Sequence, residues 1–296
     1  MFKRILVFVL LLGFSICCFA VAQDFSQIEI KTIKLTDNLY VLFGAGGNIA
    51  VSVGDDGVVM IDDQYAPLSE KIGNAVKQIS EKPIGYILNT HWHGDHTGGN
   101  EQFGNSGAVL VAHENVRKRL SEGQFMAFFN RQVPPAPKGA LPVITFTRDL
   151  KFHLNGETIS VVHVDPAHTD GDSIVFFKQA NTIHMGDVFF NGNYPFIDLG
   201  SGGSIDGVIK AVAKGLKKAH MDTRIIPGHG PLADVVDLMG YRDRRQIVRD
   251  KVWTLKQKGA SLEEVLAAKP SAKFDEAYGG GFIKPEKFVE SIYQSL

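Results

Sequence analysis

The stretch Asn89–Asn100 reads NTHWHGDHTGGN and places three histidines and one aspartate within six residues. His91, His93, Asp95 and His96 offer imidazole and carboxylate groups, which suit a zinc ion. A hydrophobic core does not gather so many polar side chains at one turn, because each buried polar group needs a partner. The spacing therefore indicates a metal site that draws further ligands from elsewhere in the chain.

Three further positions carry a possible metal ligand at the end of an expected strand. They are His168 in DPAHTDGDS, Asp187 in IHMGDVFF and His229 in IIPGHGP. Small residues flank these positions, so that the backbone can approach an ion closely. We expect one sheet edge to gather these strand ends and the histidine-rich stretch.

The candidate ligands are numerous enough for two metal ions. We divide the ligands into two sets, which are His91, His93 and His168, and Asp95, His96 and His229. The three histidines of the first set leave a fourth metal position for water, and Asp187 can bridge the two sets through its two carboxylate oxygens. Two ions that share a hydroxide make a hydrolytic centre.

The elements that must position these ligands follow the same order twice, strands and then a helix. Strands are expected at 28–35, 39–44, 48–53, 57–63, 86–90 and 108–113, with helices at 66–80 and 114–122. In the second half, strands are expected at 144–154, 159–165, 172–177, 182–187 and 223–230, with a helix capped by Ser204, a helix at 232–258 and two further helices. This order predicts two sheet-plus-helix layers packed face to face.

The motifs THWHGDHTGG, HTDGDS, GD and PGHG occur in this order, and together they resemble the metallo-β-lactamase superfamily. The resemblance spans nearly the whole chain after residue 22. It implies an α/β fold, a four-layer αββα sandwich, with two Zn²⁺ ions per chain in the cleft between the sheets. It also implies that Asp62, at the end of VVMIDD, is a structural aspartate beside the site.

Departures from the superfamily's β-lactamases bear on the substrate. Members with a cysteine ligand have that cysteine where this chain has Asp187, and commonly an arginine where it has His96. They also carry a lysine, three positions after the cysteine, that grips the substrate carboxylate, and here that position is Phe190. The histidine-rich β-lactamases usually lack the bridging aspartate. The complete set is more similar to that of glyoxalase II-like thioesterases and lactonases.

The resemblance predicts a zinc-dependent hydrolase of a small-molecule substrate. A zinc-bound hydroxide would attack an amide or ester carbonyl, while Asp95, the predicted catalytic residue, orients the nucleophile and later passes on its proton. β-Lactam ring opening is the leading candidate, since the chain is expected to be exported. The alternatives are a lactonase, a glyoxalase II-like thioesterase, an iron-dependent sulfur-metabolism member such as a sulfur dioxygenase, and a non-catalytic zinc-binding protein.

The first residues predict export. Lys3 and Arg4 precede the apolar run 5–18, and Ala20-Val21-Ala22 offers a cleavage site, so residues 1–22 are expected to be a secretory signal peptide. Residues 23–296 then form a single metallo-β-lactamase-like domain, periplasmic or secreted. The run is shorter than the ~20 residues of a spanning helix, so no stable membrane insertion is expected after cleavage. A membrane anchor and a lipid on Cys17 or Cys18 are the alternatives.

The remaining sequence features point to few other functions. The formal net charge of −1 carries no basic surplus, so nucleic acid is not an expected partner. Nothing indicates the oligomeric state. Cleavage would remove both cysteines, leaving no thiolate ligand. The other histidines are expected in the core or on the surface; His184, close to Asp187, should face the opposite side of its strand. These residues are His113, His153, His163, His184 and His220.

Two irregular segments remain. Residues 123–142 combine four prolines with aromatic side chains, among them Phe128 and Phe129, and long irregular loops often cover something. Their aromatics either patch the core or form a wall over a binding site. The glycine-rich stretch 44–48, GAGGN, joins two strands and opens no helix, so we expect a flexible hairpin tip rather than a phosphate loop.

Overall fold

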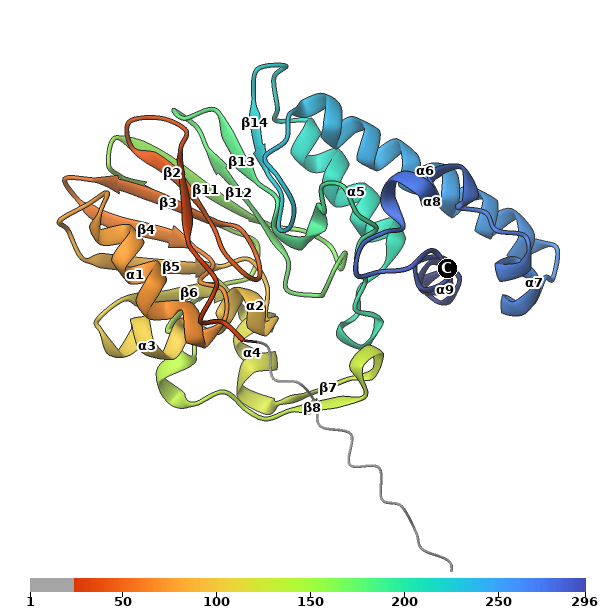
Figure 1. Cartoon of the computed structure of the whole chain (residues 1–296), viewed down its shortest axis with the longest axis horizontal. Coiled ribbons are helices and arrows are strands. Elements are labelled where there is room, and N and C mark those ends of the chain that lie inside the picture. Colours follow the sequence, from red (N-terminus) through yellow and green to blue (C-terminus); the bar gives the residue numbers. More distant parts are fainter. Residues whose placement is uncertain (1–23) are drawn as a thin grey trace, which may run out of the picture.

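The computed structural model describes residues 24–296, so the predicted signal peptide lies outside the described residues. Two sheets pack face to face (Figure 1), one with strand order β1-β2-β3-β4-β5-β6-β9 and one with order β10-β11-β12-β13-β14. The first-sheet strands are β1 (Lys31–Lys34), β2 (Leu39–Phe43), β3 (Ile49–Gly54), β4 (Gly57–Ile61), β5 (Ile84–Asn89), β6 (Val109–His113) and β9 (Ile144–Phe146). The second-sheet strands are β10 (Asp149–Leu154), β11 (Glu157–His163), β12 (Ser173–Phe177), β13 (Thr182–His184) and β14 (Arg224–Ile226).

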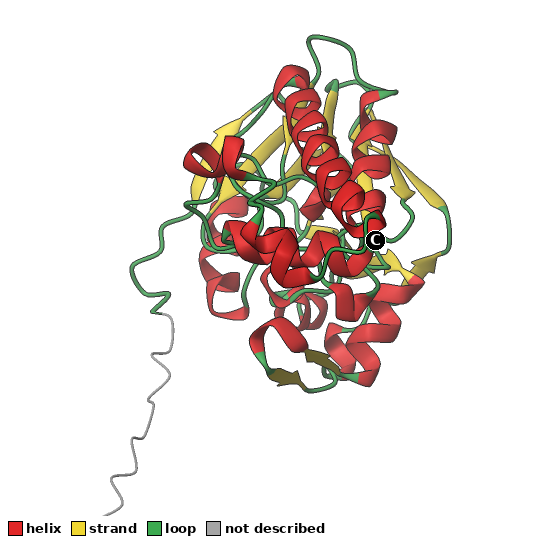
Figure 2. Ribbon diagram, turned by 90° about the vertical axis from the view of Figure 1, so that its right-hand side faces the viewer, coloured by secondary structure: helices red, strands yellow, loops and turns green. Residues whose placement is uncertain are grey.

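Helices lie on the outer faces of the two sheets. In Figure 2 the longest helix and its neighbours lie in front of the strands of the second sheet. Within residues 24–296, no helix combines the length and the apolar character that a membrane crossing requires. The helices are α1 (Ser69–Lys77), α2 (Gly94–Thr97), α3 (Asn100–Asn105), α4 (Glu114–Glu122), α5 (Ile205–Leu216), α6 (Val235–Gln257), α7 (Leu262–Ala267), α8 (Ala272–Tyr278) and α9 (Pro285–Ser295).

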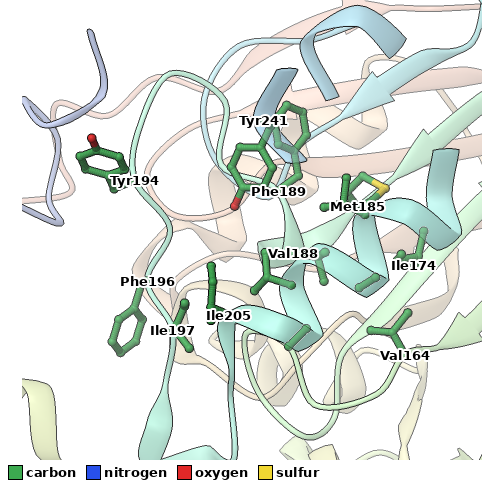
Figure 3. Packing of buried hydrophobic residues seen from close by; sticks show 14 of the residues in the cluster. Val164, Ile174, Met185, Val188, Phe189, Tyr194, Phe196, Ile197, Ile205 and Tyr241 are labelled. Carbon is green, nitrogen blue, oxygen red and sulfur yellow. The ribbon is translucent and has the colours of Figure 1, made fainter. Parts of the chain in front are cut away.

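Three hydrophobic cores separate the four layers. In β4, alternate side chains point to opposite faces, so Val59 and Ile61 enter the core between the sheets while Met60 packs outward against Ile72 of α1. Both faces of β4 are covered, and the whole strand is buried. The third core joins the second sheet to α5, α6 and α9 (Figure 3). The predicted fold class, an α/β sandwich of four layers, is confirmed.

Parallel strand pairs bring functional segments to one edge. β4 pairs with β5 in parallel, and β13 pairs with β14 in parallel. The carboxyl ends of each pair therefore face the same way, and the segments that follow β5, β13 and β14 contain six of the seven predicted ligands. The seventh, His168, follows β11, which runs in the same direction as β13 because both strands pair antiparallel with β12. The sheet topology thus supplies the common edge that the sequence required.

Several expected elements differ in the structure. The single strand expected at 144–154 is wrong: β9 joins the first sheet beside β6, and β10 starts the second sheet, because the chain crosses between the sheets at 147–148. The helix expected at 66–80 starts with a 3-10 turn containing Pro67 and ends at Lys77. Among the described residues three helices, not two, follow α6, because Pro270 separates α7 from α8 and Pro285 starts α9. Ser204 caps α5 as predicted, accepting a hydrogen bond from the backbone of Gly207.

The irregular segment 123–142 contains a small hairpin. β7 (Gln124–Met126) and β8 (Arg131–Val133) pair antiparallel, and a 3-10 turn at Ala127–Phe129 forms the connection. Asn130 closes this tip with a positive φ of 47°. Figure 1 shows the hairpin lying beside α4, outside the two sheets.

Candidate metal centre

The seven predicted ligands lie together at the shared edge of the two sheets. They fall into two groups, and within each group the candidate ligand atoms lie within 4.8 Å of one another. The histidine-rich turn after β5 supplies four of them, and the segments after β11, β13 and β14 supply one each. The groups are His91, His93, His168 and Asp187, and Asp95, His96 and His229.

The three-histidine set, which comprises His91, His93 and His168, is buried. The Nε2 of His168 lies 2.8 Å from the Nδ1 of His93 and 3.4 Å from a carboxylate oxygen of Asp187. The Nε2 of His91 lies 3.8 Å from the same oxygen. Each of these side chains is at most 6 % exposed. The three rings thus surround Asp187 where bulk water is largely excluded.

A second group fixes each ring of the three-histidine set. The His93 Nε2 lies 3.0 Å from a carboxylate oxygen of Asp198, and the His168 Nδ1 lies 2.7 Å from the Phe196 carbonyl oxygen. The His91 Nδ1 lies 3.1 Å from the Thr90 hydroxyl. Such outer partners orient a metal-binding imidazole and select the nitrogen that stays free. The free nitrogens are Nδ1 of His93 and Nε2 of His91 and His168.

The second set, which comprises Asp95, His96 and His229, is more open. Asp95 and His229 are 21 % and 26 % exposed at their side chains, whereas His96 is fully buried. The His96 Nε2 lies 3.3 Å from the His229 Nε2 and 3.1 Å from an oxygen of Asp187. The Asp95 carboxylate lies 3.2 Å from the His229 Nε2. Asp187 therefore stands between the two sets.

Asp62 links the end of β4 to this centre. It has a positive φ of 65° and accepts hydrogen bonds from the backbone and hydroxyl of Thr90 at 2.7 and 2.8 Å. Its second oxygen lies 2.7 Å from the Nδ1 of His96. One buried carboxylate thus fixes both the start of the histidine-rich turn and a ring of the second set, which is the position that the family resemblance implied.

The geometry fits metal ions because unprotonated nitrogens converge. His168 donates its Nδ1 proton to a carbonyl and His93 donates its Nε2 proton to a carboxylate, so in the neutral rings the facing nitrogens carry lone pairs. Burial lowers the pKa of His168 to about 4, which keeps this ring neutral at pH 7. Among the described residues, the buried Nε2 of His91 and Oδ1 of Asp187 find no hydrogen-bond partner. A cation satisfies all of these atoms.

The charges of the second set lead to the same conclusion. Burial lowers the pKa of His229, but the Asp187 and Asp95 carboxylates outweigh it and raise that pKa to about 9. Burial also opposes ionisation of Asp187, yet His96 and the neighbouring imidazoles hold its pKa well below the usual range. The cluster therefore stabilises positive charge beside an ionised Asp187, and this favours the binding of a cation.

Glycines let the backbone approach this centre. Gly47 donates its backbone N–H to the Asp95 carbonyl at 3.0 Å, and a Cβ on Gly47 would overlap the His96 ring. Gly228 is similarly placed against Asp187. The stretch 44–48, expected to be a flexible hairpin tip, is therefore a packed wall of the site. Its contact with His96 joins segments far apart in sequence, and the glycine pattern alone did not reveal it.

Two carboxylates escaped sequence reasoning. Asp198 orients His93, but it lies outside any metal motif and gave no signal. Asp172 belongs to HTDGDS and accepts hydrogen bonds from the backbone of His168 and Thr169 at 2.6 and 2.9 Å. Burial raises the pKa of Asp172 to about 7. The second aspartate of that motif thus holds the loop that presents His168.

The other histidines lie outside the two ligand groups. His184 is buried and bonds through Nε2 to the Asn48 carbonyl at 2.9 Å, so it does not point at Asp187. His113 stacks on His163, with ring centroids 3.7 Å apart. The remaining two, His153 and His220, are exposed. These positions agree with the expectation that the five histidines lie in the core or on the surface.

Phe190 lies where the resemblance placed a substrate-gripping lysine in some β-lactamases. Its ring stacks on His229 with centroids 5.1 Å apart and planes 13° apart. The Phe190 ring also lies 6.0 Å from the ring of His168. This position therefore presents an apolar surface to the centre instead of a cation.

Three known proteins are similar to this chain in sequence or fold. A hydroxyacylglutathione hydrolase from Pelagibacter ubique is 25 % identical over 210 residues, which cover 68 % of this chain and 71 % of that protein. The alpha subunit of a 2,4-dinitroanisole O-demethylase from Nocardioides sp. is 27 % identical over 146 residues; the match covers 47 % of this chain and only 40 % of that subunit's length. A metallo-β-lactamase structure from Pontibacter korlensis superposes with a TM-score of 0.60 at 18 % identity, covering 74 % of this chain and 99 % of that chain.

The family model for the metallo-β-lactamase superfamily matches residues 43–238. This segment contains every predicted ligand, from the histidine-rich turn to His229, and both sheets of the sandwich apart from its first strand and part of its second. The clustering of the ligands, the four-layer sandwich and this match agree, and the chain belongs to the metallo-β-lactamase superfamily.

Proposed function

We propose that this metallo-hydrolase is an exported dinuclear zinc enzyme that hydrolyses a small-molecule ester, thioester or amide, breaking the bond between the carbonyl carbon and the leaving oxygen, sulfur or nitrogen. The convergence of two ligand sets on Asp187, with ring nitrogens of His93 and His168 facing one another at 2.8 Å, carries the proposal. Export rests on the signal peptide predicted over residues 1–22.

The seven side chains divide naturally between two ions. His91, His93 and His168 would hold one, and Asp95, His96 and His229 would hold the other, with Asp187 shared. Zinc ions bound there would lower the pKa of a water molecule to near neutral and polarise the substrate carbonyl. The protein's own contribution is to hold each ring by an outer partner, so that the ligands need little reorganisation during the reaction.

Asp95 is the group best placed to move a proton. It is the partly exposed carboxylate of the cluster, 21 % accessible, whereas Asp187 is buried. Burial raises the pKa of Asp95, but His96 and His229 outweigh it and lower that pKa to about 2, so the group is ionised and can accept a proton. We assign it the role of orienting the attacking water and passing the proton to the leaving group.

The walls of the site bear on the choice of substrate. Phe190 covers His229 with an apolar ring, so a β-lactam carboxylate loses the charged contact that a lysine would make at this position. Such a contact to a charged group contributes about 1.5–3 kcal/mol. We therefore expect β-lactams to be turned over with a high KM, and esters and thioesters to be better substrates. The hydroxyacylglutathione hydrolase relative supports a thioester in particular.

Metal analysis and a substrate panel test this proposal. Purified protein should contain two zinc ions per chain by mass spectrometry, lose activity on chelation and regain it with zinc. The panel contains nitrocefin, a lactone, p-nitrophenyl acetate and an acyl-glutathione thioester. His153→Ala serves as the control, since this exposed histidine lies outside the cluster. One iron ion without zinc, or zinc without turnover of any panel member, would overturn the proposal.

A further inference from the structure

Four phenylalanines, here called the aromatic cluster, meet beside the metal centre. The rings of Phe128 and Phe129 lie 5.1 and 5.8 Å from the ring of Phe196. Phe282 lies 5.4 Å from Phe128 and stacks on Phe129 at 5.7 Å with planes 16° apart. The residues come from the hairpin tip, the loop after β13 and the loop between α8 and α9. Three distant segments thus build one apolar surface.

Phe196 connects the aromatic cluster to the three-histidine set. Its ring stacks on His93, with centroids 5.7 Å apart and planes at 25°, and lies 5.6 Å from His168. Its carbonyl also holds the His168 ring. Figure 3 shows Phe196 next to Ile197 on the loop that follows Tyr194. The apolar surface therefore begins at the metal ligands and continues outward.

The outer part of the aromatic cluster is exposed. Phe128 and Phe129 are 42 % and 44 % accessible, and Phe282 is 62 % accessible. Scattered apolar residues are common on protein surfaces, but a contiguous group beside a reactive centre indicates a binding surface. The hairpin is also an element added outside the two sheets, so the core does not require its tip.

A cavity of about 320 Å³ adjoins the aromatic cluster. One side of the cavity is largely apolar and includes Phe128, Phe196 and Leu199, next to the Asp198 carboxylate. The other side is polar and consists of α9 side chains, namely Lys287, Glu290, Ser291 and Gln294. The size of the cavity lies at the lower end of the ~300–1,000 Å³ typical of small-molecule pockets. Its volume offers room for a short alkyl chain or a single ring on the side lined by Phe128 and Phe196.

The cluster is placed on one side of the centre. It contacts His93 and His168 of the three-histidine set, whereas Asp95 belongs to the second set. A leaving group that takes its proton from Asp95 lies toward the second set. The other substituent of the carbonyl carbon, the acyl chain, then points toward Phe196 and the aromatic cluster.

We infer that the aromatic cluster binds the apolar acyl group of a carboxylic ester or thioester whose carbonyl lies at the metal centre. This inference rests on the proposed hydrolase function and adds its substrate class, a medium-chain or aryl acyl derivative without a charge near the carbonyl. The acyl group covers the exposed faces of Phe128, Phe129 and Phe282. Phe196 contacts the part of the acyl group that lies next to the carbonyl carbon.

A series of p-nitrophenyl acetate, butanoate and hexanoate tests the inference with one leaving group. Full burial of each added methylene raises kcat/KM about fourfold by its transfer free energy, and a half-exposed wall gives about twofold. We expect this rise in the zinc-loaded enzyme. In Phe128→Ala and Phe282→Ala the rise should flatten, so that the ratio of the kcat/KM for hexanoate to that for acetate falls toward one.

Phe125→Ala is the matched control. Phe125 lies in the same hairpin and is 56 % exposed, and the aromatic pairs of the cluster within residues 24–296 are formed by the other phenylalanines. This variant should keep the full dependence on chain length. An equal loss for all three esters, or the same flattening in Phe125→Ala, would overturn the inference while leaving the hydrolase function in place. Absence of hydrolysis of every ester would instead contradict the proposed function.

A binding assay without turnover distinguishes the contribution of the aromatic cluster from that of the metal ions. The neutral dye Nile red should bind chelated and zinc-loaded protein alike, with binding weakened by Phe128→Ala and unchanged by Phe125→Ala. Light scattering at increasing protein concentration examines the rival occupant, a second copy of the chain. A dimer that dissociates on Phe282→Ala, together with unchanged ester selectivity, would assign the surface to association and refute acyl binding.

Discussion

The two ligand sets differ in how firmly the protein holds them. Each ring of the three-histidine set is buried and has a polar partner on its outer nitrogen, from Asp198, Phe196 or Thr90. In the second set His96 has such a partner in Asp62, but Asp95 and His229 are partly exposed. Outer partners and burial raise the affinity of a metal site. One half of the centre is thus preorganised, and the other is open to solvent and substrate.

This difference follows from where each set sits in the fold. His168 and its partners lie in loops packed between the second sheet and α5, as the backbone bond of Ser204 to Ala167 shows. His229 follows β14, the edge strand of its sheet, and stacks on the partly buried Phe190. In the proposed two-metal hydrolase, the buried set would keep its geometry while the open set admits substrate and releases product.

Asp187 is the residue whose loss should affect both sets most. Asp187→Asn keeps the shape of the side chain but removes the charge that faces His91, His96, His168 and His229. Loss of an outer partner alone costs about 10–100-fold in affinity or activity, so loss of the shared ligand should exceed that range. Zinc content and hydrolysis should both fall severely, while circular dichroism stays unchanged. Near-normal zinc and turnover would show that Asp187 is not shared.

Gly47→Ala should damage the second set selectively. A methyl group at this position overlaps the His96 ring, so either the loop or the ring must move. We expect loss of zinc from the second set, retention of one zinc per chain, and a decrease in rate of about 10–100-fold, as for other disturbances of metal ligation. Gly94→Ala is the control, because a Cβ there meets open space within the same turn. Equal effects of the two substitutions would contradict a steric role for Gly47.

The sequence predicted the parts of the centre that lie in short motifs. Local spacing identified His91, His93 and His96 and the strand ends at Asp187 and His229, because each needs only its immediate neighbours to be recognised. The order of strands and helices predicted two sheet-plus-helix layers, and the family resemblance implied the four-layer sandwich. The separation of β9 from β10 was missed, since a strand that leaves one sheet and a strand that enters the next read as one run when two residues separate them.

Features that depend on contacts between distant segments could not be predicted. Asp198 reaches His93 across 105 positions of sequence. Gly47 touches His96 through the packing of two turns, and the aromatic cluster needs Phe282 beside Phe128. From the sequence, the aromatic side chains of residues 123–142 could either patch the core or form a wall over a binding site. Phe128 and Phe129 stay partly exposed and contact Phe196, whereas Met126 enters the core, so only some of these side chains patch the core.

Asp198→Asn should weaken the three-histidine set by a smaller amount. The carboxylate holds the His93 Nε2 proton and also accepts the Ser201 hydroxyl at 2.6 Å, so the amide keeps the shape but weakens both bonds. We expect about a tenfold loss of affinity at this set, the low end of the range for outer partners. A zinc titration that shows the tighter step weakened, with the weaker step unchanged, checks this. If only the weaker binding step changed, Asp198 would support the second set instead, and this prediction would be wrong.

Chelation should reveal the contrast between the sets without any substitution. The side chains of Asp95 and His229 are 21 % and 26 % exposed, so water and a chelator can reach the second set directly. The rings of the three-histidine set are at most 6 % exposed and have outer partners, which slows their release. Increasing dipicolinate should therefore remove one zinc per chain at low concentration and the second only at higher concentration. Turnover should fall with the first step, because Asp95 loses its place in the centre when the open set empties. His229→Ala should abolish the first step and leave the second. Simultaneous release of both ions in the unmodified protein would mean that Asp187 couples the two sets more strongly than their difference in burial separates them.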